Sequence, residues 1–207
     1  MKKFLFIAFI LILSGVNAFA LPFVKKETTE IYTQAEQYQE VTQQANVLYA
    51  ENNINQAKDL LLSIPENQRT AQNWLLIGNI LQDQGKSDEA VFMYKKAVSV
   101  NDEYYKAYYN LGNIYLSENK PNMAAEQYSK VVKLNPDYAY GHYNLACAYI
   151  KLGKYSKAKF ELYNAIDLKS SEPDFYYNLI YILKKQNKEK EAKKYIEIYN
   201  KLTGENV

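Results

Sequence analysis

The sequence predicts an all-α fold in which one pair of helices, repeated along the chain, stacks into a solenoid. The tripeptide Tyr-Asn-Leu occurs three times at intervals of 34 residues, beginning at Tyr109, Tyr143 and Tyr177. Alanine keeps the same period at Ala90, Ala124, Ala158 and Ala192. Between these positions, apolar residues recur at the spacing of one helix face. A helical pattern with this period indicates stacked helix pairs rather than one globular core.

Residues 1–20 have the pattern of a secretory signal peptide. Lys2 and Lys3 precede an apolar run, and the small residues Ala18 and Ala20 mark a cleavage site. We therefore expect cleavage after Ala20 and export to the periplasm or the outside of the cell. Val16 stands where a bacterial lipoprotein would have its cysteine, so no lipid anchor is expected.

The alternative is a leader that stays in the membrane. Residues 4–24 carry almost no charge and just reach the ~20 residues that span a bilayer. In that case the protein would be a membrane-anchored scaffold. Gly15, Asn17 and Pro22 interrupt the run, and lysines flank it on both sides, which favours cleavage.

The segment after the leader predicts an irregular copy of the repeated unit. Residues 21–37 are expected to form a helical extension, because apolar positions continue through Ala35 and Val41 without proline or glycine. Residues 38–70 are expected to form a degenerate repeat followed by a linker at Pro65.

Four regular units are expected next, at residues 71–104, 105–138, 139–172 and 173–207. In the second unit Tyr108, Leu111 and Tyr115 fall on one face of a first helix. Pro121 can begin the second helix, because the first turn needs no backbone N–H there. Asn135-Pro136 ends it, since the residue before a proline avoids the helical conformation. Each unit is therefore expected to be a helix, a turn and a second helix.

These units resemble the tetratricopeptide repeat. The family's pattern of a bulky residue, Leu-Gly, and then a small and an aromatic residue is met in the second unit at Tyr108, Leu111-Gly112, Ala124 and Tyr128. The resemblance extends from residue 38 to the C-terminal end and is weakest in the last unit, where Ile180 replaces the small residue. It implies a right-handed α-solenoid that binds another protein.

The resemblance also implies a concave groove, lined by the first helices, that receives a peptide or a helix of a partner. Asparagine amides can donate to and accept from a partner's backbone, and tyrosines are frequent at interface hot spots. In register, the candidate groove residues are Asn79, Lys106, Tyr109, Asn110, Asn113, Tyr140, Tyr143, Asn144, Tyr177, Asn178 and Tyr181.

Other ligands of such a groove can be weighed from its residues. Arg69 is the only arginine and lies outside the groove, so the two-pronged grip of a carboxylate that arginine offers is absent. A tyrosine-rich groove could also stack on sugar rings, and a cell-wall or glycan-binding envelope protein is therefore the alternative function. A helix predicted at residues 188–202 carries Tyr195, Ile198 and Leu202 on one face with no helix after it, which predicts fraying or a homodimer.

Composition excludes some partners. Loss of the leader removes Lys2 and Lys3, so 25 basic residues become 23 and equal the 23 acidic residues. Such a balance disfavours nucleic acid, which binds proteins with an excess of positive charge. The charge is uneven, with 11 basic and 15 acidic residues at 21–137 but 12 and 8 at 138–207.

The sequence predicts neither an enzyme nor a metal or cofactor site. His142 and Cys147 are the only histidine and the only cysteine. Five residues place them about 140° apart around a helix, so they do not form a nucleophile and its base. One histidine and one cysteine are also too few for a zinc site. His142 occupies the slot of Trp74, Tyr108 and Tyr176, which predicts a packed ring.

Overall fold

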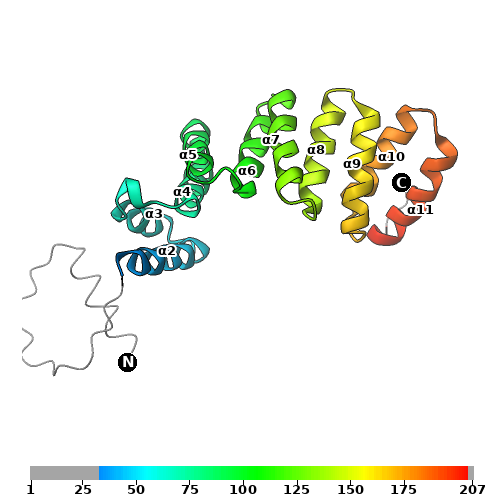
Figure 1. Ribbon diagram of the computed structural model, residues 1–207. Helices are drawn as coiled ribbons and strands as arrows, with labels where there is room; N and C mark the ends of the chain where they lie inside the picture. The colour runs from blue at the N-terminus through cyan, green and yellow to red at the C-terminus, as the bar shows by residue number, and fades with distance from the viewer. Residues whose placement is uncertain (1–32, 205–207) are drawn as a thin grey trace, which may run out of the picture. The chain divides into compact units, whose positions relative to one another are not determined.

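The computed structural model describes residues 33–204, and in this range it contains ten α-helices, one 3-10 turn and no strand (Figure 1). The chain divides into two compact units between Arg69 and Thr70. The signal peptide, its cleavage site and residues 21–32 of the helical extension lie outside the described residues and stay predictions. Within the described part, no helix combines the length and the apolar character that crossing a bilayer requires.

The N-terminal compact part, up to Arg69, is one helix pair, α2 (Gln34–Ala50) and α3 (Ile54–Ser63), followed by the 3-10 turn η1 (Glu66–Gln68). Thr33 caps α2: its hydroxyl accepts from the Glu36 backbone N–H, and the Glu36 carboxylate accepts from the Thr33 N–H. This reciprocal arrangement is a capping box and explains why the helix begins at Gln34. Val41 of α2 and Leu61 of α3 are buried in the unit.

The second compact part begins at Thr70 and contains four helix pairs, one for each regular repeat unit. Their bounds are α4 (Ala71–Asp83) and α5 (Ser87–Val100), α6 (Tyr105–Ser117) and α7 (Pro121–Leu134), α8 (Ala139–Lys151) and α9 (Tyr155–Leu168), and α10 (Pro173–Lys185) and α11 (Glu189–Thr203). The turn inside each pair needs one residue with positive φ, and it holds glycine or asparagine, at Gly85, Asn119, Gly153 and Asn187.

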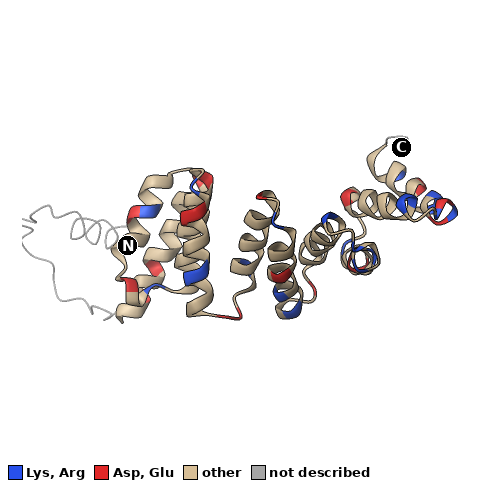
Figure 2. Ribbon diagram, turned by 90° about the horizontal axis from the view of Figure 1, so that it is seen from above, with Lys and Arg blue, Asp and Glu red and all other residues tan. Residues whose placement is uncertain are grey.

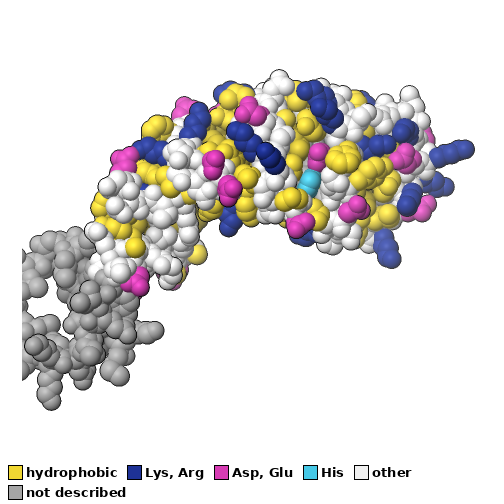
Figure 3. Space-filling view, in the orientation of Figure 1, with side chains coloured by type: hydrophobic (Ala, Val, Ile, Leu, Met, Phe, Trp, Pro, Cys, Tyr) yellow, Lys and Arg dark blue, Asp and Glu magenta, His cyan; other side chains and the backbone are white. Residues whose placement is uncertain are grey.

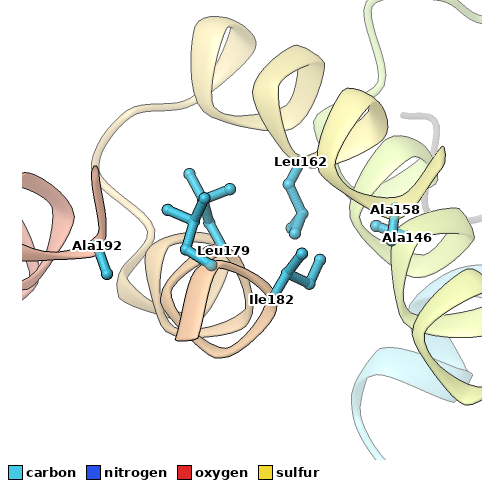
Figure 4. Packing of buried hydrophobic residues seen from close by; sticks show 7 residues of the cluster. Ala146, Ala158, Leu162, Leu179, Ile182 and Ala192 are labelled. Atoms are coloured by element: carbon cyan, nitrogen blue, oxygen red, sulfur yellow. The ribbon is translucent and has the colours of Figure 1, made fainter. Parts of the chain in front are cut away.

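The alanines of the 34-residue period lie at the centre of these pairs. Ala90, Ala124, Ala158 and Ala192 are all 0 % exposed. The period that the sequence shows is therefore a period of core positions. Figure 4 shows the packing around Ala158, where Leu162 of α9 lies between Ala146 of α8 and the Leu179 and Ile182 side chains of α10.

Inside each pair, the size of one residue on the first helix is matched to one on the second helix. Gly112 faces Tyr128: a Cβ atom on Gly112 would lie 2.6 Å from the Tyr128 ring, so only glycine fits. Gly78 and Tyr94 repeat this match one unit earlier. In the next unit alanine replaces the glycine at Ala146, and Leu162 replaces the tyrosine. The smaller side chain of leucine leaves room for the added methyl group.

Candidate functional site

Side-chain hydrogen bonds connect the first helix of each pair to the first helix of the next pair. The Asn110 amide in α6 donates to Asn79 Oδ1 in α4 over 2.8 Å. The Asn144 amide in α8 donates to Asn113 Oδ1 in α6 over 3.1 Å. Together with a bond from Asn178 of α10 to Cys147 of α8, these bonds bring α4, α6, α8 and α10 together on one surface, here called the first-helix face. It is the surface for which the sequence predicts a groove.

Tyrosines from the second helices complete these bonds. The Tyr94 hydroxyl lies 2.9 Å from Asn79 Oδ1, and the Tyr128 hydroxyl donates to Asn113 Oδ1 over 2.7 Å. Asn113 Oδ1 therefore accepts two hydrogen bonds, one from its own unit and one from the next unit. The Tyr94 hydroxyl lies between two acceptors, because Gln82 Oε1 is 2.8 Å away, and its single proton serves one of them. We call this repeated set of Asn79, Asn113 and their donors the asparagine ladder.

The ladder changes in the third unit. Cys147 occupies the position of Asn79 and Asn113, and Leu162 occupies the position of Tyr94 and Tyr128. The Asn178 amide now donates to the Cys147 sulfur over 3.4 Å. The two changes fit together chemically. Leu162 has no hydroxyl group, so an asparagine oxygen at position 147 would have no donor within its own unit. Among the described residues, no buried side-chain nitrogen or oxygen lacks a hydrogen-bond partner.

The predicted groove asparagines thus have a structural role that the sequence did not reveal. The Asn110, Asn144 and Asn178 amides hold neighbouring first helices together. Their acceptors are, in the same order, Asn79, Asn113 and Cys147. A partner's backbone would meet amide groups that are already partly in use. The 34-residue period predicted where these residues lie, but the donor of each bond is 31 residues away, in the next unit.

The predicted groove tyrosines divide into two groups. Tyr109 and Tyr143 are half-buried against other rings: the Tyr109 ring centroid is 5.3 Å from that of Tyr138, the residue just before α8, and the Tyr143 centroid is 4.8 Å from that of Phe175 in α10. Tyr177 and Tyr181 are the exposed ones, at 55 % and 39 %. The exposed tyrosines therefore lie on α10.

Tyr138 and Phe175 are part of this surface, but sequence reasoning missed them. Phe175 is fully buried and contacts both Tyr140 and Tyr143. It occupies the position of Asn73, Ala107 and Gly141 in the preceding units, so its ring has no counterpart there. A single aromatic residue in a slot otherwise held by smaller, non-aromatic residues is the signal that could have found it.

Lys106 and Tyr140, the remaining predicted groove residues, differ in their surroundings. Lys106 is exposed. The Tyr140 hydroxyl accepts from Lys169 Nζ over 2.8 Å, and the same ammonium lies 2.6 Å from Glu172. The hydrogen bond from Lys169 to Glu172 raises the pKa of Lys169 and lowers the pKa of Glu172. This pair at the border of the third and fourth units was not predicted.

His142 is buried, as its slot predicts, but it is also hydrogen-bonded on both sides. Nδ1 lies 2.7 Å from a Glu161 carboxylate oxygen of α9, and Nε2 lies 2.9 Å from the Pro136 carbonyl oxygen. Both neighbours are acceptors when Glu161 is ionised, so the doubly protonated ring satisfies both. The hydrogen bond with Glu161 raises the pKa of His142 against the opposing effect of burial.

Cys147 does not pair with His142 and instead accepts a hydrogen bond from Asn178. Burial raises the pKa of its thiol to about 11, so the nucleophilic thiolate is scarce at neutral pH. In the described part of the chain, no group of three or more histidine, cysteine, aspartate or glutamate side chains is placed to hold a metal ion.

Tyr195 corrects the prediction for the last helix. Its ring packs between the third and fourth units, with its centroid 6.4 Å from those of Tyr163 in α9 and Tyr176 in α10. Of the predicted apolar face, Leu202 is the residue left exposed, at 39 %. Self-association through this helix stays a prediction, now with less apolar surface to support it.

Comparison with known proteins places these observations in a family. The family model described as the C-terminal ARM domain of tetratricopeptide repeat protein 21 matches residues 16–160. The chain belongs to this tetratricopeptide repeat family. Among curated proteins, no sequence matches it.

Solved structures give the same tetratricopeptide fold. The MamA structure of residues 41 to the end from Desulfovibrio magneticus RS-1 is 19 % identical, with a TM-score of 0.70, and the alignment covers 83 % of this chain and 96 % of that one. Another crystal structure of MamA is 20 % identical, with a TM-score of 0.70 and coverage of 81 % and 91 %. The predicted solenoid of tetratricopeptide repeats is confirmed, and it is the fold of a protein-interaction scaffold.

Proposed function

We propose that the protein is a non-catalytic binding module of the cell envelope, and that its first-helix face receives a peptide or a helix of a partner protein. The observation that supports this role is the pair of exposed rings Tyr177 and Tyr181 on α10, on the same face as the asparagine ladder. Exposed tyrosines are typical anchors of protein interfaces.

The amide groups of the ladder support a second part of this proposal. Because they join α4, α6, α8 and α10, they hold the first-helix face in one arrangement before a partner arrives. A preformed surface loses less conformational entropy on binding. In this proposal the ladder orders the surface, and the exposed tyrosines make the contacts.

Capture from an envelope extract tests the function. The full chain is compared with Tyr177→Ala/Tyr181→Ala and with a control, Phe92→Ala/Phe160→Ala, which removes two rings that are at least as exposed (55 % and 62 %) from the second helices α5 and α9. We expect wild type and control to capture the same proteins and the tyrosine variant to lose at least one. Identical capture by all three would show that the first-helix face is not the binding surface.

The envelope location and the alternative ligand have their own tests. N-terminal sequencing of exported material should begin at Leu21 if the leader is removed. Binding to isolated cell wall, lost in the tyrosine variant and kept in the control, would instead support a glycan-binding protein.

A further inference from the structure

Lysines and tyrosines of the third and fourth units meet at the last turn of α10. The Tyr181 ring contacts Tyr155, the first residue of α9, with centroids 6.5 Å apart. Lys185 Nζ lies 5.7 Å from the centroid of the Tyr181 ring. The end of α8 and the turn after it add Lys151 and Lys154. We call these residues the basic tyrosine patch: Lys151, Lys154, Tyr155, Tyr181, Lys184 and Lys185.

The charge of the patch is not neutralised locally. Its four lysines are exposed, and none has an ion-pair partner within residues 33–204. Helix α8 contains no acidic residue, and α10 contains only Asp174, in its first turn. Just beyond α10, Lys188 shares the single carboxylate of Glu191 with Lys159. Lysine positions are frequent along the last helices, as the blue ribbon segments of Figure 2 and the dark blue side chains of Figure 3 show.

The favourable position of a cation near a helix C-terminus explains part of this pattern. Lys151, Lys184 and Lys185 lie in last turns, where the helix dipole stabilises positive charge. The dipole does not explain why the patch belongs to these units alone. At the positions of Lys151 and Lys185, the first two regular units have Asp83 and Ser117.

Lys120 shows the contrast most directly. It occupies the position of Lys154 one unit earlier, and its ammonium is 2.8 Å from Glu118. That ion pair, with its hydrogen bond, raises the pKa of Lys120. Lys154 has no such carboxylate beside it in the described chain, so its charge remains available to a ligand.

Tyr181 marks the end of the asparagine ladder. It occupies the position of Asn79, Asn113 and Cys147, each of which accepts a hydrogen bond from the next first helix. In the described chain no first helix follows α10, so the ring of Tyr181 lies at the open end of the face, 39 % exposed. A partner placed there would cover an aromatic ring between lysines.

We propose that the basic tyrosine patch binds an acidic peptide segment of a partner protein. The inference rests on the proposed function and names the chemistry of its partner. The lysines come from α8, the following turn and α10, so a small anion would meet one or two of them, whereas a segment with several carboxylates meets all four. Opposite charges of this kind speed association and select the partner.

The ring geometry favours a peptide over a sugar polymer. Tyr155 and Tyr181 meet edge to face, at 68°, and do not offer two parallel faces that could hold a flat ring between them. Apolar side chains of a peptide can contact such a ring from its edge or its face, while the carboxylates on either side reach the lysines.

Fluorescence anisotropy with defined probes tests the proposal on the full chain. One labelled peptide repeats Glu-Leu-Glu-Ala, and a second has glutamine at every glutamate. We expect the glutamate peptide to bind at least about tenfold more tightly at low salt, and raising NaCl to weaken it, because exposed ion pairs are screened. Equal binding of the two peptides would overturn the proposal.

Two matched triple variants locate the site. We expect Lys151→Gln/Lys184→Gln/Lys185→Gln to weaken the glutamate peptide about tenfold. The control Lys95→Gln/Lys133→Gln/Lys193→Gln removes three exposed lysines from second helices and should leave binding unchanged. Equal weakening in both would mean that only net charge matters and would overturn the proposal. Circular dichroism melting checks that both variants fold.

Two further outcomes separate this inference from the proposed function. Tighter, lysine-dependent binding of an alginate oligosaccharide would overturn the peptide class in favour of an anionic glycan. A captured partner that depends on Tyr177 and Tyr181 but not on the three patch lysines would overturn the inference and leave the proposed function in place.

Discussion

Asn144 of α8 donates a hydrogen bond of 3.1 Å to Asn113 of α6, an oxygen that also accepts from Tyr128 within its own repeat. One side-chain oxygen therefore serves two purposes: it fixes the pairing of two helices inside a repeat and the junction to the next repeat. Because repeat proteins gain stability from both kinds of contact, this oxygen contributes to the cooperativity of the solenoid.

Tyr128→Phe should lower stability by about 1 kcal/mol, the usual net contribution of one side-chain hydrogen bond. The ring stays in place, and only the donor to Asn113 is lost. Urea unfolding measures the change. A double-mutant cycle with Asn113→Ala should show a coupling of about 0.5–1.5 kcal/mol, and strictly additive effects would contradict the hydrogen bond.

Gly112→Ala should lower stability by about 1–3 kcal/mol, because the added Cβ would lie 2.6 Å from the Tyr128 ring. The better helix propensity of alanine offsets part of this loss. The matched control is the double variant Gly112→Ala/Tyr128→Leu, which reproduces the pair Ala146 and Leu162. With Tyr128→Leu already present, the added Gly112→Ala should cost little or nothing. A full loss in that background would show that the ring is not the obstacle.

The pair of His142 and Glu161 should make stability depend on pH. The pKa of His142 is raised in the folded chain, so its contribution is complete below the ordinary histidine pKa and is lost as the pH rises through the folded value. Urea unfolding of wild type and His142→Tyr should therefore show wild type losing stability relative to the variant at alkaline pH. Glu161→Gln should reduce this dependence, and an unchanged pH dependence would count against the pair.

Cys147 should react slowly with alkylating reagents while the protein is folded. With a pKa of about 11 its thiol is protonated at neutral pH, whereas an unfolded cysteine has a pKa of about 8.5. Iodoacetamide labelling at pH 7.5 should be about two orders of magnitude slower without urea than in concentrated urea. Similar rates in both would mean that burial does not protect the thiol.

The fold could be predicted from the sequence because its signals repeat. Helix pairs, the buried alanines and the close approach at Gly112 each follow from a local pattern that appears in several units. The 34-residue register also placed the asparagines and tyrosines on one surface. What each of them contacts could not be read in the same way, because those contacts join residues of different units.

The unpredicted features lie where one unit departs from the others. Phe175 fills a slot of small residues, and Glu161 pairs with a histidine in a slot of aromatic rings. The half-burial of Tyr109 and Tyr143 depends on the rings of Tyr138, at the end of the same repeat, and of Phe175, in the next repeat, which periodicity alone does not reveal. The exposed rings at Tyr177 and Tyr181 follow from α10 being the last first helix of the described chain, a property of the whole stack.

The match between Gly112 and Tyr128, and between Ala146 and Leu162, lies within a single repeat. The ladder bond, by contrast, needs one amide group from the next repeat. A repeat duplicated or deleted as a whole thus carries its own interior fit and meets a neighbour with a simple, shared connector. Such a chain can grow or shorten by whole repeats without redesign of its interior. The number of repeats that the chain keeps therefore sets the size of its contact surface.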